Sequence, residues 1–228
     1  MYNIVYYIKV EKKLKTKIIL IRHGESLGNK DRIILGHTDL DLSEHGYLQA
    51  KTTAEHLKNE KIDRIYSSDL KRAYNTALYN AKMHNLDVIT DIRLREMYVG
   101  DWEGLPVTEI IEKWGREVFE DDWHGHFGTF TFPGGEFIQD GAERFYNCVI
   151  ELAEQNIGNT IIIAAHAAVI RAFWAKICHI PWENVVNELP FATNASYSIC
   201  YYENKTITPD KYSVDDHLIE VGITRVKV

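Results

Sequence analysis

Two short apolar runs constrain the fold of this chain more than any other feature. Residues 17–21 read Lys-Ile-Ile-Leu-Ile, and residues 160–165 form a second unbroken apolar stretch. Continuous runs of this length are typical of strands that are buried on both faces of a parallel sheet. Each run ends abruptly in polar residues, which are Arg-His-Gly at 22–24 and His166. We therefore expect two central strands, each followed by a loop that carries chemistry.

Helical periodicity fills most of the sequence between these strands. Ser43 and Asp69 are candidate N-caps, because each precedes apolar residues at helical spacing. The alternation predicts an α/β three-layer sandwich, with a mainly parallel central sheet flanked by helices. The expected helices cover residues 43–59, 69 to about 83, 136–156 and 167–179, and the further strands cover 64–67, 88–90 and a β region from 196 onward.

We expect a single domain over residues 17–228, preceded by an N-terminal extension over residues 1–16. Glycine and proline break the pattern between about 102 and 135, which predicts a lid insertion with one short helix. The insertion is rich in aromatic residues, which favours an organic substrate larger or less polar than phosphoglycerate. The aromatic side chains and one histidine expected to cover the ligand are Trp102, Trp114, Phe119, Trp123, His124, Phe127, Phe130 and Phe132.

Composition excludes several other classes of protein. A net charge of -7 makes nucleic acid a poor partner. The three cysteines form no C-x-x-C pattern, so neither a disulfide framework nor a zinc site is expected. The apolar runs are too short for a membrane span, which needs about 18 residues. Apolar residues 1–10 precede the first lysine cluster, the reverse of a secretory signal, so we expect a cytoplasmic protein.

The polar residues after the strands predict an anion site. The carboxyl ends of parallel strands meet at one edge of a sheet, so His23 and His166 face one pocket if their strands are neighbours. Arg22 lies beside the first histidine, and Arg72 lies in the first turn of the helix after strand 64–67. Two guanidiniums and a helix N-terminus suit a tetrahedral phosphate.

Five ordered blocks of sequence resemble the histidine phosphatase superfamily, the phosphoglycerate mutase-like proteins. The resemblance covers about residues 17–189, and a weaker match occurs at residues 216–218. In chain order the blocks are residues 22–26 with Asn29, 36–39 with 42–46, 67–73, 94–96 with 100–104, and His166 with 169–171.

The resemblance implies a role for each matching residue. His23 is the expected nucleophile and forms a phosphohistidine, while Glu96 protonates the leaving oxygen and later activates water. His166 completes the catalytic group. The phosphate is expected to contact Arg22, Asn29, Arg72 and the backbone of Ala167, and the substrate to border Leu35 and Gly36. The resemblance implies no cofactor and no metal.

Two positions depart from the family pattern. The family usually has Ser-His-Gly where this chain has Ala165-His166-Ala167, and a polar residue where it has Leu35. If phosphate binding requires a positive φ at Ala167, its Cβ costs about 1 kcal/mol or more and activity falls. Leu35 removes one possible hydrogen bond to the substrate.

The sequence thus favours a phosphomonoester hydrolase that acts on a small organic phosphate, and it is compatible with a homo-oligomer. The alternatives are a cofactor-dependent phosphoglycerate mutase and a weakly active phospholigand-binding or regulatory module. Taken singly, Arg72 and Glu96 also fit surface ion pairs, Arg72 with Asp69 for example. A metal cluster of Asp121, Asp122, His124 and His126 is the remaining alternative, but the sequence favours a lid there.

Overall fold

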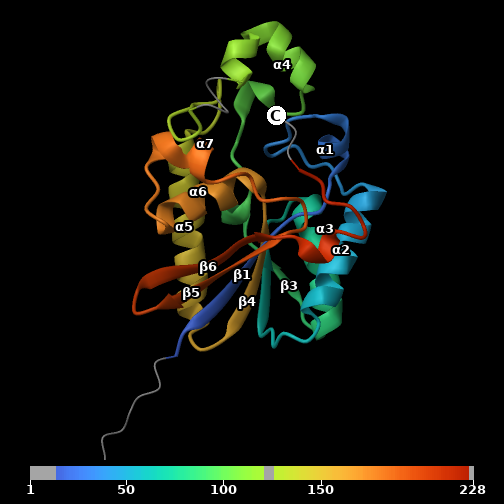
Figure 1. Cartoon of the computed structure of the whole chain (residues 1–228), viewed down its shortest axis with the longest axis vertical. Coiled ribbons are helices and arrows are strands. Elements are labelled where there is room, and N and C mark those ends of the chain that lie inside the picture. Colours follow the sequence, from blue (N-terminus) through green and yellow to red (C-terminus); the bar gives the residue numbers. More distant parts are fainter. Residues whose placement is uncertain (1–13, 121–125, 226–228) are drawn as a thin grey trace, which may run out of the picture.

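The computed structural model describes residues 14–120 and 126–225. In this part of the chain one six-stranded sheet has the order β3-β2-β4-β1-β5-β6 (Figure 1). The first four strands in sequence are parallel, and the last two continue the sheet antiparallel. The strands are β1 (Thr16–Arg22), β2 (Arg64–Ser67), β3 (Val88–Thr90), β4 (Thr160–Ala165), β5 (Tyr197–Glu203) and β6 (Thr206–Val214).

Helices cover both faces of this sheet. Ile19 and Ile21 of β1 pack with residues of α2 and α3, whereas Ile18 and Leu20 pack with residues of α5 and α6. Figure 1 shows the same two helical layers on opposite sides of the strands. The predicted sandwich is therefore confirmed. The α-helices are α1 (Leu27–Asp31), α2 (Glu44–Leu57), α3 (Lys71–His84), α4 (Val107–Trp114), α5 (Ile138–Gln155), α6 (Ala167–Ile177) and α7 (Val185–Glu188), and short 3-10 turns are η1 (Ile92–Leu94), η2 (Gly100–Trp102), η4 (Trp182–Asn184) and η5 (Asp216–Leu218).

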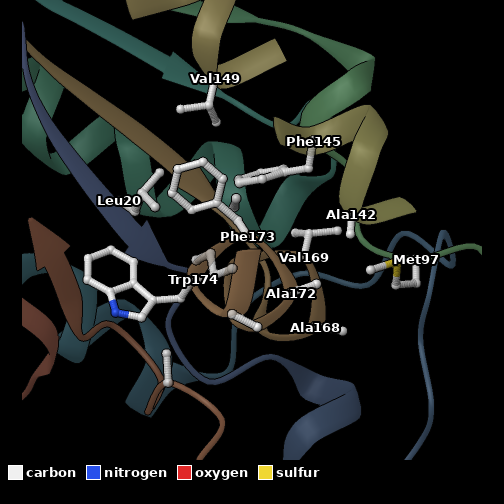
Figure 2. Packing of buried hydrophobic residues seen from close by; sticks show 14 of the residues in the cluster. Leu20, Met97, Ala142, Phe145, Val149, Ala168, Val169, Ala172, Phe173 and Trp174 are labelled. Carbon is white, nitrogen blue, oxygen red and sulfur yellow. The ribbon is translucent and has the colours of Figure 1, made fainter. Parts of the chain in front are cut away.

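Helix α6 fixes the loop at the end of β4. Its residues from 167 to 175 are all buried. Phe173 contacts Phe145 of α5 edge to face, with ring centroids 5.8 Å apart, and both belong to the cluster that contains Leu20 and Val149 (Figure 2). A helix packed so tightly holds its N-terminus, and with it His166, in one place.

The two predicted N-caps have different outcomes. Ser43 caps α2 as expected, and its Oγ accepts from the backbone N–H of Gly46 at 3.0 Å. The prediction for Asp69 is wrong, because α3 begins after Leu70 and has no side-chain cap. Asp69 instead accepts a hydrogen bond from Arg95 Nε at 2.7 Å. Sequence alone did not reveal this pair, since its members are 26 positions apart.

The aromatic insertion contains the predicted short helix, α4, but of the expected rings that the structure describes, Phe132 alone lines the cavity beside His23. Trp102 contacts Phe119, Phe130 and Phe132, and all four side chains are buried. The prediction of a lid made by the whole aromatic set is wrong in this respect, because mutual burial of the rings removes more apolar surface from water. Trp123 and His124 lie outside the described residues. The described helices include none with the length and apolarity of a membrane span.

The loop after β1 packs on α2 through two glycines. A Cβ on Gly46 would lie 1.9 Å from the backbone carbonyl oxygen of Glu25, and a Cβ on Gly24 would lie 2.4 Å from that of Gly46. Backbone carbonyls cannot move aside as a flexible side chain can. Gly46 therefore lets the first turn of α2 approach the loop that carries His23.

We predict that Gly46→Ala destabilises the protein by about 2 kcal/mol and lowers activity, although alanine favours a helix more than glycine does by about 1 kcal/mol. The matched control is Gly141→Ala in α5, where a Cβ meets the side-chain atoms Met97 Sδ and Glu136 Oε2. We expect a smaller loss there. Urea unfolding measures both, and an unchanged or raised stability of Gly46→Ala would contradict the close approach.

Candidate active site

The pairing of β1 with β4 brings the two predicted histidines together. Arg22 lies opposite Ala165 in the parallel register. The backbone N–H of His23 donates to the Ala165 carbonyl at 3.0 Å. The rings of His23 and His166 are 5.2 Å apart between centroids. The loops that follow β1 and β4 therefore lie side by side, as expected.

The ring of His23 is held in one tautomer. Its Nδ1 donates to the Gly24 carbonyl at 2.7 Å, which leaves Nε2 with its lone pair. Burial, together with the charges of Arg72 and Arg22, holds the pKa of His23 well below its usual value. A neutral imidazole with a free Nε2 is the form that attacks phosphorus.

His166 lies beside His23 and is fully buried. Neither of its ring nitrogens has a hydrogen-bond partner among the described residues. Burial and the nearby cation Arg72 hold its pKa well below the usual range as well. Buried polar atoms without partners are costly unless a ligand or water supplies the bond, and the catalytic role expected for His166 stays a prediction.

Two buried guanidiniums stand beside the histidines. Arg72 donates through Nη1 to the Thr38 carbonyl at 2.8 Å and through Nη2 to the Gly36 carbonyl at 2.7 Å. Arg22 donates through Nη1 to the Ala192 carbonyl. Burial lowers the pKa of each arginine to about 10, so both remain charged at neutral pH. The alternative ion pair of Arg72 with Asp69 does not form, because Asp69 pairs with Arg95.

A partly buried network of hydrogen bonds from Glu103 shapes the loop whose carbonyls hold Arg72. Its carboxylate accepts from the backbone N–H groups of His37 and Thr38, at 2.8 and 2.7 Å, and from Thr38 Oγ1 at 2.7 Å. It also accepts from Val99 N at 3.2 Å. The sequence blocks included Glu103 but gave it no role.

Glu96 binds the N-terminus of α6. Its Oε2 accepts from Ala168 N at 3.1 Å and its Oε1 from Val169 N at 3.0 Å. Ala167, the first residue of the helix, is not among the residues with positive φ. The predicted strain at Ala167 is therefore absent, because the helical backbone accommodates its Cβ.

A cavity of about 110 Å³ lies between these groups. Apart from His166, every predicted site residue lines it. Phe132, which was expected to cover the ligand, also lines the cavity. No sequence signal indicated the other lining residues, which are Ile33, Ile34, Met97, Val99, Ala168 and Phe191. The lining includes the predicted residues Arg22, His23, Asn29, Leu35, Gly36, Arg72, Glu96 and Ala167.

The described residues contain no group of three or more histidine, cysteine or acidic side chains with the geometry to hold a metal ion. Three members of the alternative cluster, Asp121, Asp122 and His124, lie outside the described residues. The structure therefore does not place that cluster.

Comparison with known proteins identifies the family. The chain is 34% identical over 204 residues to phosphoserine phosphatase 1 of Hydrogenobacter thermophilus, covering 90% of this chain and 95% of the relative. It is 32% identical over 217 residues to a metal-independent phosphoserine phosphatase of Arabidopsis thaliana, covering 94% and 88% of the two chains. The solved structure of mycobacterial glucosyl-3-phosphoglycerate phosphatase in complex with VO3 matches with a TM-score of 0.78, at 30% identity, over 87% of this chain and 98% of that one. Since residues 18–215 match the model of the histidine phosphatase superfamily, branch 1, the chain belongs to this superfamily.

Proposed function

We propose that the protein hydrolyses small organic phosphate monoesters through a phosphohistidine on His23, with water as the final acceptor. The observation that carries the proposal is the His23 ring, whose Nδ1 bond to Gly24 leaves Nε2 free at a cavity lined by two buried guanidiniums. Similar proteins that are named as phosphatases of small organic phosphates support it.

In the first step, Nε2 of His23 attacks phosphorus, and the bond between phosphorus and the ester oxygen breaks. Arg22 and Arg72 stabilise the charge on the transferring group, which stays high in a loose transition state. Asn29 and the N–H of Ala167 are the expected further donors. Glu96, in its protonated form, gives the leaving oxygen a proton, so that an alcohol departs.

In the second step, Glu96 removes a proton from water, and the water oxygen attacks phosphorus. The bond between Nε2 and phosphorus breaks, and inorganic phosphate leaves with the imidazole neutral again. The two α6 N–H groups hold the carboxylate of Glu96 against the cavity, where one group can serve both steps.

The two alternatives have less support. A mutase uses the same first step but needs a second organic acceptor in place of water. The cations of α4 and its extension give such an acceptor little help, because Lys113 pairs with Glu109 and Arg116 with Glu120. The regulatory module was motivated by strain at Ala167, which the helical backbone removes.

Four further statements remain predictions. They are the cytoplasmic location, the absence of nucleic-acid partners, the possible homo-oligomer, and the single domain over residues 17–228 with its lid insertion. Most of the N-terminal extension, residues 1–13, lies outside the described residues, and β1 begins at Thr16.

We predict that His23→Ala abolishes turnover and that Glu96→Gln slows alkyl phosphates far more than nitrophenyl phosphates. Only a poor leaving group needs a proton in the transition state, so we expect a loss of about 10² to 10⁴ for alkyl esters. Steady-state kinetics with both ester classes measures the difference. An equal loss on both classes would remove Glu96 as the acid, and turnover by His23→Ala would refute the nucleophile.

We also predict that Glu103→Ala lowers kcat/KM by about 10- to 100-fold, the usual effect of removing a group that orients a functional side chain. Glu103→Gln, which keeps the shape, should lose less. The test is a double-mutant cycle with Arg72→Ala. If Glu103 acts through Arg72, its removal costs little once Arg72 is gone, whereas a full additive loss would show an independent, merely structural effect.

A further inference from the structure

Asn194 is a buried residue that connects the loop of His23 to the side chain of Asn29. It is 1% exposed, and its Nδ2 donates to the His23 carbonyl at 3.1 Å and to Asn29 Oδ1 at 3.0 Å. These partners lie 171 and 165 positions away in the sequence. One side chain from the segment before β5 therefore contacts both the nucleophile's backbone and a residue expected to bind phosphate.

The neighbours of the Asn29 amide determine which way it faces. The backbone N–H of Ser26 can only donate, so the atom that it meets at 3.2 Å is the oxygen, Oδ1. The His23 carbonyl can only accept, so the group of Asn194 that it meets is the N–H2 group, which also donates to Asn29 Oδ1. Each of the two amides thus has one orientation that satisfies all these bonds.

This orientation leaves the N–H2 group of Asn29 for a ligand. Both hydrogen bonds of its side chain fall on Oδ1, and its Nδ2 makes none with another described residue. Asn29 lines the cavity that contains His23 and Arg72. A reversed amide would present its oxygen to the phosphate, and neither that oxygen nor an ionised phosphate oxygen can donate a hydrogen bond.

The carbonyl that orients Asn194 is itself held from both sides of its peptide. It accepts a second hydrogen bond, at 3.1 Å, from the backbone N–H of Ala195. The N–H of the same peptide belongs to Gly24 and donates to Thr76 Oγ1 at 3.0 Å. The His23 carbonyl is therefore a fixed acceptor, and the position of the nucleophile's loop sets the position of the Asn194 amide.

The backbone around Asn194 is fixed as well. Ala195 has a φ of 57°, in the left-handed region that a residue with a Cβ adopts only at a cost. Its carbonyl accepts from Thr53 Oγ1 at 2.8 Å, and the backbone N–H of Asn194 donates to the Thr224 carbonyl at 3.0 Å. Strain of this kind persists where the surrounding structure determines the backbone, and it is concentrated at functional sites.

We propose that Asn194 is a positioning residue, which holds the Asn29 amide with its N–H2 group toward the phosphate. Asn194 is not part of the lining of the active-site cavity, so it acts through Asn29. The inference rests on the proposed function, which assigns Asn29 to the phosphate. With Asn194 in place, a reversal of the Asn29 amide breaks two hydrogen bonds and opposes donor to donor at both.

The first test is Asn194→Ala, with binding of inorganic phosphate measured by calorimetry. We expect affinity to fall by about tenfold, the usual effect of losing one hydrogen bond to a charged group. The matched control is Asn156→Ala, another buried asparagine, whose Nδ2 donates to Tyr66 Oη at 2.9 Å and to the Leu152 carbonyl at 2.7 Å. None of these three residues lines the cavity, so the control should lose stability and keep its phosphate affinity.

A double-mutant cycle distinguishes positioning from a general loss of structure. Asn29→Ala removes the group through which Asn194 acts. In that background Asn194→Ala should therefore change phosphate affinity by about twofold or less, within the range of additivity errors. A merely structural role predicts the same loss of affinity in both backgrounds.

A measurement on the wild-type chain applies even if Asn194→Ala does not fold. In ¹⁵N-labelled protein, the side-chain N–H2 resonances of Asn29 are identified by their absence in Asn29→Ala. We expect both the nitrogen and a proton of this group to shift when phosphate binds. Phosphate binding without such a shift would show that the N–H2 group does not face the ligand, and would overturn the inference.

These readouts need no turnover, so they separate the inference from the proposed function. A loss of phosphate affinity in Asn194→Ala that depends on Asn29 supports the positioning role even if no ester is hydrolysed. An unchanged affinity, an equal loss in both backgrounds, or a wild-type chain that binds no phosphate overturns it.

Discussion

 The parallel pairing of β1 with β4 is the constraint on which the rest of the site depends. The paired residues Arg22 and Ala165 are 143 positions apart in the sequence. Hydrogen bonds of the buried sheet and the packing of both its faces fix this register, since a shift by one residue would exchange the side chains that pack on α2 and α3 with those that pack on α5 and α6. The carboxyl ends of β1 and β4 therefore meet, and His23 and His166 meet with them.

The two guanidinium groups at this edge of the sheet donate hydrogen bonds to backbone carbonyls and not to carboxylates. Arg72 donates to Gly36 and Thr38, and Arg22 to Ala192. The carbonyl oxygens accept hydrogen bonds from some N–H groups of each guanidinium but do not neutralise its charge. The positive charge therefore remains available to bind an anion. The same field keeps His23 neutral and nucleophilic.

The sequence predicted the elements whose signal is local. The unbroken apolar runs identified β1 and β4, and Ser43 marked the start of α2. The predicted N-cap at Asp69 was wrong because the side chain of Asp69 pairs with Arg95, which belongs to a distant segment. Phe191 and the bonds of Glu103 were not predicted, because each depends on how irregular segments pack. The strain expected at Ala167 was wrong because a dipeptide pattern does not specify the φ of its residue.

The central claim is that His23 carries the phosphoryl group before water receives it. Rapid quench with ³²P-labelled substrate, followed by peptide mapping, tests it most directly when it is combined with turnover in ¹⁸O-labelled water. The account predicts a short-lived, acid-labile label on His23 and one ¹⁸O atom in each phosphate released in a single turnover. Absence of the label from His23, or ¹⁸O in the released alcohol instead of the phosphate, would contradict it.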